Sequence, residues 1–211
     1  MLELVGQQFM DLQTFRYAFQ VMDEQVLRNM GLDIDAIDEV FQFLNRGRDD
    51  SLQEYLDAPF ANRKKFSEES RYSDGSYCVF YSALEPETAE AEVKFRQIKR
   101  AIGNARNQRT VYYLLFSCQF SGSCKDLRPF LGDFPFLTAD NYTECNELGL
   151  EAVGEGLDGL VVPSARRLEG TCLPVFKRPA LSAPRQERLG AFTYDPASGD
   201  VSISALPIEQ A

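Results

Sequence analysis

The chain has 211 residues, which suffices for one ordinary domain with a hydrophobic core. Its 32 acidic against 22 basic residues leave a formal net charge of −10, so general binding of nucleic acid or of an anionic membrane is not expected. The five cysteines are odd in number and scattered, which favours a reducing compartment, and a chain without histidine is a poor candidate for a metal site.

The first 60 residues are predicted to form a helical extension. Apolar residues recur at helical spacing on both sides of Gly31, namely Phe15, Phe19 and Met22 before it and Ile34, Ile37, Val40, Phe41 and Leu44 after it. This spacing predicts two amphipathic helices between residues 9 and 45, and Ser51 ahead of Glu54 predicts the N-cap of a third, over residues 51–56. We expect the extension to pack on the rest of the protein; a partner-docking surface or a lid is the alternative.

Residues 61–211 are predicted to form an α+β domain. The expected elements, in chain order, are a strand at 78–83, a helix at 87–100, a strand at 111–118, a helix at 142–151, strands at 160–162 and 172–176, and a hairpin at 191–204. The aromatic-rich loop at 122–138 either lines a pocket or packs as a structural excursion. The GxGxxG pattern at 154–159 follows a helix and precedes a strand, the reverse of a dinucleotide fingerprint, and is interpreted as a turn.

Three residues at spacings of ten and eleven surround the first strand of this domain. Arg71 lies in a polar turn before the strand, Tyr81 near its end, and Glu92 about two turns into the following helix. An arginine offers a fork of donors suited to phosphate, a tyrosine a stacking face, and a carboxylate a negative charge for a developing cation. With Ser164 at the end of a later strand, they predict chemistry on an anionic nucleotide.

Each of these residues also has a purely structural interpretation. Glu92 is four residues from Arg96 and could form a surface pair with it, Arg71 could be a surface cation beside acidic neighbours, and Tyr81 could be a core tyrosine. Ser164 lacks a histidine base, so binding is favoured over covalent attack. Basic residues near the site, either as phosphate contacts or as a solvated surface, are Arg63, Lys64, Lys65, Arg166 and Arg167.

Three segments resemble the RES domain, a family of NAD+-consuming toxins of toxin–antitoxin systems and related effectors. They are RYSDGSYCVFYSALEPETAEAEVKF, TADNYTECNELGLEAVGEGLDGLVVPSAR and GTCLPVF, and the similarity spans residues 60–180 or so. The resemblance implies a mixed β core of the ADP-ribosyltransferase type with flanking helices. It assigns Arg71, Tyr81, Glu92 and Ser164 to the NAD+ site, makes NAD+ a substrate with no further cofactor, and implies an antitoxin or immunity protein as partner.

The resemblance implies cleavage of the nicotinamide–ribose bond. Nicotinamide leaves as a neutral molecule, so the absence of histidine is no obstacle, and a carboxylate near the anomeric carbon stabilises an oxocarbenium-like transition state. Glu92 is expected in that role, Arg71 on the pyrophosphate, Tyr81 beside the nicotinamide end and Ser164 orienting the ribose. Water, phosphate and a protein side chain remain as acceptors, giving a glycohydrolase, a phosphorylase or an ADP-ribosyltransferase; a catalytically silent binding protein is the alternative of another class.

The place of action is expected to be a cytoplasm. The N-terminal residues lack the basic patch and apolar run of a secretory signal, and no apolar run reaches membrane-spanning length. We therefore expect a soluble protein that acts where it is made or after delivery into a target cell.

Overall fold

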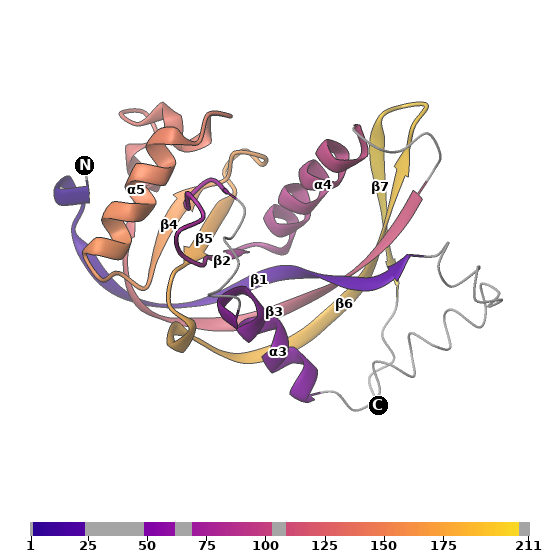
Figure 1. The fold of residues 1–211 in the computed structure, drawn as a ribbon, viewed down its shortest axis with the longest axis horizontal. Coiled ribbons are helices and arrows are strands. Elements are labelled where there is room, and N and C mark those ends of the chain that lie inside the picture. Colours follow the sequence, from indigo (N-terminus) through magenta and orange to yellow (C-terminus); the bar gives the residue numbers. More distant parts are fainter. Residues whose placement is uncertain (1, 24–48, 62–68, 103–108, 207–211) are drawn as a thin grey trace.

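The computed structural model describes residues 2–23, 49–61, 69–102 and 109–206 (Figure 1). Its strands are β1 (Gln7–Asp23), β2 (Phe80–Ala83), β3 (Arg109–Asp126), β4 (Gly159–Pro163), β5 (Thr171–Val175), β6 (Leu181–Asp195) and β7 (Asp200–Leu206). Its α-helices are α3 (Asp49–Ala61), α4 (Pro86–Ile102) and α5 (Thr143–Gly154). Single 3-10 turns are η1 (Leu2–Leu4), η2 (Arg128–Phe130), η3 (Pro135–Thr138) and η4 (Arg178–Ala180).

The strands form one mixed sheet of seven strands in the order β1-β2-β5-β4-β3-β6-β7, which confirms the predicted α+β class. β1 also pairs antiparallel with β3 along most of its length, so the first five strands close on themselves. β6 and β7 extend from β3 as the predicted terminal hairpin. In Figure 1 the long strands β1, β3 and β6 run across the molecule, with α4 and α5 on one side and α3 on the other.

Each helix covers its own buried cluster. The α3 and α4 clusters lie on opposite faces of the sheet, because the side chains of β3 alternate between these faces. Leu114 and Phe116 pack with Leu56 of α3, whereas Tyr113 packs with Val93 of α4. A third cluster joins α5 to η1, β4 and the end of β3, with Leu2, Leu127, Leu148 and Leu160 fully or almost fully buried. Packing in these clusters positions α4 and α5 relative to the ends of β3 and β4.

The helical prediction for the N-terminal extension is wrong for residues 7–23, which form β1. Even-numbered residues such as Leu12 and Ala18 pack toward the α3 cluster, and odd-numbered ones such as Phe15 and Tyr17 toward the α4 cluster. Residues 14–18 of β1 are buried or half-buried on both faces, so this part loses the apolar–polar alternation of an ordinary strand and its apolar residues can fall at helical spacing by coincidence. The second predicted helix lies outside the described residues. The third is present, but it begins at Asp49, so Ser51 is not its N-cap.

The remaining elements have the predicted types, although β6 begins at Leu181, ten residues before the predicted hairpin. β3 is longer than expected and takes up the first part of the segment 122–138, and the remainder forms η2 and η3. Phe130, Phe134 and Phe136 pack against the α5 cluster, and Leu137 is fully buried, so this segment is packed rather than free. Residues 154–159 connect α5 to β4 as predicted. None of the described helices is both long and apolar enough to cross a membrane.

Candidate functional site

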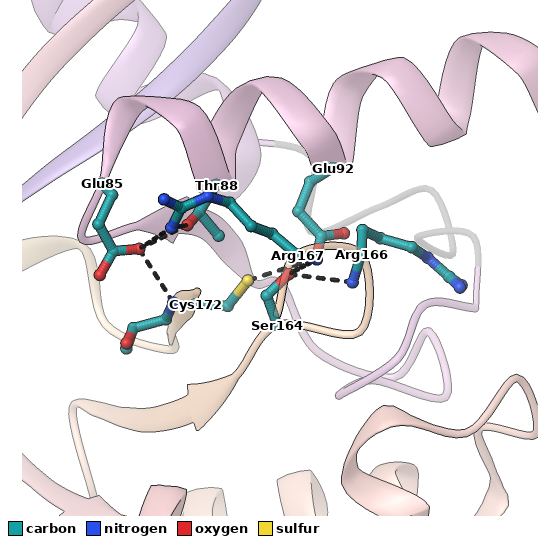
Figure 2. A network of polar contacts seen from close by, with 8 residues as sticks. Glu85, Thr88, Glu92, Ser164, Arg166, Arg167 and Cys172 are labelled. Carbon is teal, nitrogen blue, oxygen red and sulfur yellow. Dashed lines mark hydrogen bonds and ion pairs between the residues drawn. The ribbon is translucent and has the colours of Figure 1, made fainter. Parts of the chain in front are cut away.

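Glu92 and Ser164 contact each other directly. α4 begins at Pro86, a residue well suited to the first helical position, which places Glu92 in the second turn. Ser164 follows the last residue of β4. The Ser164 hydroxyl donates a hydrogen bond of 2.7 Å to Glu92 Oε1, across 72 residues of sequence (Figure 2). The structure therefore joins two of the predicted site residues and gives Glu92 a partner other than Arg96.

The Ser164 hydroxyl is held in one orientation. Its oxygen accepts backbone N–H bonds from Arg166 (3.1 Å) and Arg167 (3.2 Å), and only 6% of the residue is exposed. The Ser164 N–H donates to the carbonyl of Gly170, which closes the loop 164–170. With both lone pairs occupied, the hydroxyl proton has one direction left, toward Glu92. This arrangement suits a residue that positions a carboxylate and not a nucleophile.

A second polar cluster, which sequence analysis missed, ties the same loop to the start of α4 (Figure 2). Arg167 Nη1 donates to Thr88 Oγ1 (3.2 Å), and Thr88 Oγ1 donates to Glu85 Oε2 (2.5 Å), which also accepts the Thr171 N–H (3.0 Å). In Figure 2 the Arg167 guanidinium runs back along α4, away from Ser164. Glu85 directly precedes α4 and Thr88 follows it by three residues, which is the spacing of a capping box with the two residue types reversed, and this was the available sequence signal.

Thr88→Val is expected to lower the free energy of unfolding by about 1–3 kcal/mol, the range for leaving buried polar groups without their partner. Thr88 is fully buried, and valine of the same shape can neither donate to Glu85 nor accept from Arg167. Chemical denaturation measures the effect, with Thr88→Ser as the matched control that keeps the hydroxyl. A loss in Thr88→Ser with none in Thr88→Val would show that packing of the methyl group, not the polar cluster, holds the loop.

Arg71 is docked on the segment between η3 and α5. Its Nη1 donates to the carbonyl oxygens of Leu137 (3.3 Å) and Ala139 (2.6 Å), and its guanidinium lies 4.7 Å from the ring centroid of Tyr142. The acidic neighbour Asp74 instead accepts hydrogen bonds from Ser76. Arg71 is thus a half-buried, aromatic-stacked cation rather than a free surface charge.

Tyr81 supports the turn that carries Arg71. Its hydroxyl lies 2.8 Å from Ser70 Oγ and accepts the Tyr72 N–H at 2.9 Å. Burial raises the pKa of Tyr81 to about 12, so the phenol is neutral at physiological pH. The hydroxyl is therefore satisfied within the protein, as in the core interpretation, and its partners are the two residues on either side of Arg71.

Cys172 lies between the Glu92–Ser164 pair and the Arg71 turn. β5 pairs with β2 and β4 so that Cys172 stands between Ala83 and Val162, and its Sγ is 3.5 Å from Glu92 Oε1. Burial, with the nearby carboxylate of Glu92, raises the pKa of the thiol well above its ordinary value, so the thiol is neutral. Cys172 also lies close enough to Tyr72 to contribute, after burial and Cys145, to the raised pKa of that phenol.

Four chain segments are linked in series. Glu92 of α4 contacts Ser164, Arg166 of the loop 164–170 contacts Asp140, and Arg71 of the turn at 70–75 contacts Ala139. Two direct links hold the predicted residues, one between Glu92 and Ser164 and one from Tyr81 to the neighbours of Arg71. Arg63, Lys64 and Lys65 lie outside the described residues. Within the described part of the chain, no group of three or more Cys, Asp or Glu side chains is arranged to hold a metal ion.

The fold and these contacts define an α+β protein with a helix-borne carboxylate held against a serine at a strand end. The family model of the RES domain matches residues 46–195, and the chain belongs to this family. The predicted membership is confirmed, and the match begins nearer the N-terminus than the segments that suggested it. The family comprises toxin-like proteins and is associated with NAD+-related enzymatic activity. No curated protein matches the chain.

Proposed function

We propose that this protein degrades NAD+ by cleaving the nicotinamide–ribose bond, as a glycohydrolase or a phosphorylase. The observation that carries the proposal is the hydrogen bond from Ser164 to Glu92, because it fixes a carboxylate of the kind that stabilises an oxocarbenium-like transition state. Membership of the RES family supports the choice of NAD+. An ADP-ribosyltransferase that uses the same site differs only in the acceptor.

Glu92 has one oxygen for the protein and one for the substrate. Oε1 accepts from Ser164 and contacts the neutral thiol of Cys172. Oε2 has no hydrogen-bond partner among the described residues, so it is available to the ribose next to the breaking bond. As positive charge develops on that ribose, the negative charge of Glu92 stabilises it, and nicotinamide leaves without needing a proton. A fixed carboxylate does this with little reorganisation.

Arg71 is proposed to bind the pyrophosphate. Its Nη1 is engaged with two carbonyl oxygens, which leaves the Nε and Nη2 edge as the donors for phosphate. Tyr81 is proposed to act at the nicotinamide end through its ring, since its hydroxyl is already bonded. β1 belongs to the same unit, because Arg16 Nη1 donates to the carbonyl of Tyr81 at 2.9 Å.

A cytoplasmic site of action and a neutralising partner complete the proposal. All five cysteines are free thiols, which suits a reducing compartment. An enzyme that consumes NAD+ in the cell that makes it has to be restrained, and we propose an antitoxin or immunity protein that covers the Glu92 region. Co-purification with such a partner is expected to suppress turnover.

Product analysis tests the function. Purified protein is mixed with NAD+, with and without phosphate and cell lysate, and the products are separated by chromatography and identified by mass spectrometry. Free nicotinamide with ADP-ribose is expected from the glycohydrolase, and ADP-ribose carrying a phosphate at the anomeric carbon from the phosphorylase. ADP-ribose attached to a lysate protein, with no free ADP-ribose formed when lysate is absent, would point to the transferase. Intact NAD+ in every mixture would refute the proposal and favour a binding protein.

A further inference from the structure

Two arginines from distant segments contact adjacent residues near the proposed site. Arg71 donates to the carbonyl oxygen of Ala139 at 2.6 Å, and Arg166 Nη1 lies 2.9 Å from Asp140 Oδ1. Each guanidinium is also stacked on an aromatic ring: Arg166 lies 3.4 Å from the ring centroid of Phe95, and Arg71 stacks on the ring of Tyr142. Stacking restricts the planar forks, so both donor sets are held in place before any ligand arrives.

The partners of the Arg166–Asp140 ion pair differ greatly in exposure. The side chain of Arg166 is 13% exposed and that of Asp140 is 82% exposed. A largely buried cation is costly without an anion beside it, whereas an exposed aspartate is fully solvated when it swings away. Arg166 therefore requires an anion at this position, but the anion need not be Asp140.

Further positive charges lie near the turn that carries Arg71, although the whole chain is acidic. Burial lowers the pKa of Arg16 to about 10, and the positive charge of Arg96 adds to this. Arg96 and Arg71 both oppose the rise in the pKa of Tyr81 that burial causes. Arg16, Arg71 and Arg96 thus all lie within electrostatic reach of one tyrosine, next to the turn that carries Arg71.

We propose that Arg166 and Arg71 together bind a phosphate group, and that Asp140 is an internal counterion which this group displaces. A phosphate oxygen takes the place of the Asp140 carboxylate on Arg166, and a second oxygen reaches the free edge of Arg71. The chemistry is that of a phosphate with at least one negative charge. Its source is either the pyrophosphate of NAD+ or inorganic phosphate as acceptor, and this assignment of source rests on the proposed function.

Asp140→Asn tests the displacement, because it removes the competitor and leaves both arginines. The variant is expected to bind ADP or inorganic phosphate about two- to fivefold more tightly. This ratio of Kd values corresponds to the free energy of an exposed ion pair. Isothermal titration of the full chain with each probe measures it. Asp133→Asn, an exposed aspartate on the same segment, is the matched control for the change in net charge and is expected to bind as the wild type does.

Arg166→Gln tests the opposite change, because it removes the cation that binds the phosphate. It is expected to weaken binding of the same probe by tenfold or more, and Arg166→Lys, which keeps the charge but not the fork, to fall between it and the wild type. Thermal melting of each variant reports whether the fold is retained. The probe whose binding Arg166→Gln weakens identifies the source: a loss for ADP alone assigns the site to the pyrophosphate, and a loss for inorganic phosphate alone assigns it to the free anion. A loss for both, with inorganic phosphate displacing ADP, shows that the two share the site.

The displacement is overturned if Asp140→Asn binds both probes as weakly as the wild type or more weakly, because a purely structural ion pair offers no competition to remove. The outcome is independent of turnover. If the wild type cleaves NAD+ but Asp140→Asn shows no gain, only the phosphate site fails. If the gain is present and NAD+ stays intact, the phosphate site stands and the proposed reaction fails.

Discussion

Glu92→Gln is expected to lower kcat for NAD+ cleavage by roughly 10²–10³-fold, the range for loss of one preorganised electrostatic contact in the transition state. Glutamine is nearly the same shape, and its carbonyl oxygen can still accept the Ser164 hydrogen bond, so the fold should persist. What the substitution removes is the negative charge facing the ribose. Initial rates of nicotinamide release over a range of NAD+ concentrations separate kcat from KM.

The matched control is Glu87→Gln, which neutralises an exposed carboxylate in the first turn of the same helix. It is expected to retain the wild-type rate. Equal activity of Glu92→Gln and the wild type would remove Glu92 from the chemistry, and a Tm far below that of the wild type would make the rate uninterpretable. A large loss in kcat with an unchanged Tm and a near-wild-type KM is the signature of a charge that acts in the transition state.

Gly149→Ala is expected to be strongly destabilising, by about 2–3 kcal/mol, the upper part of the range for overpacking. A Cβ at this position of α5 would lie 2.3 Å from the Tyr72 carbonyl oxygen and 2.5 Å from the Tyr77 hydroxyl, which themselves form a hydrogen bond of 2.6 Å. Relief requires movement of α5 or of the turn that carries Arg71. The expected fall in Tm is roughly 5–10 °C for a chain of this size.

Gly154→Ala is the matched control on the same helix. A Cβ there meets no heavy atom within 4 Å, so the substitution adds only helix propensity, worth up to about 1 kcal/mol. The two alanine variants should therefore shift Tm in opposite directions. If both raised it, α5 would not be packed on the Tyr72–Tyr77 turn as closely as the distances indicate. A fall in NAD+ affinity in Gly149→Ala beyond the unfolded fraction would show that this contact also positions Arg71.

Local sequence determined most of the elements of residues 78–204 and the chemistry expected of them. α4 is set by Pro86 at its first position and by apolar residues at helical spacing, both of which act within a few residues. The short strands β4 and β5 are brief apolar runs bounded by turn residues. The residue types Arg71, Glu92 and Ser164, in motifs typical of the RES family, sufficed to predict the family.

Tertiary structure decided what those local patterns do not contain. β1 is a strand because it pairs with β3 along most of its length and because two core clusters cover residues 14–18 on both sides, which no window of its own sequence reveals. The approach of Ser164 to Glu92 depends on the antiparallel pairing of β4 with β5, and of β5 with β2, which also brings in Cys172. Hydrogen bonds between residues far apart in the chain form only when the strands are in register, so the partners of Glu92 and the pairing of Arg166 with Asp140 were decided by the fold.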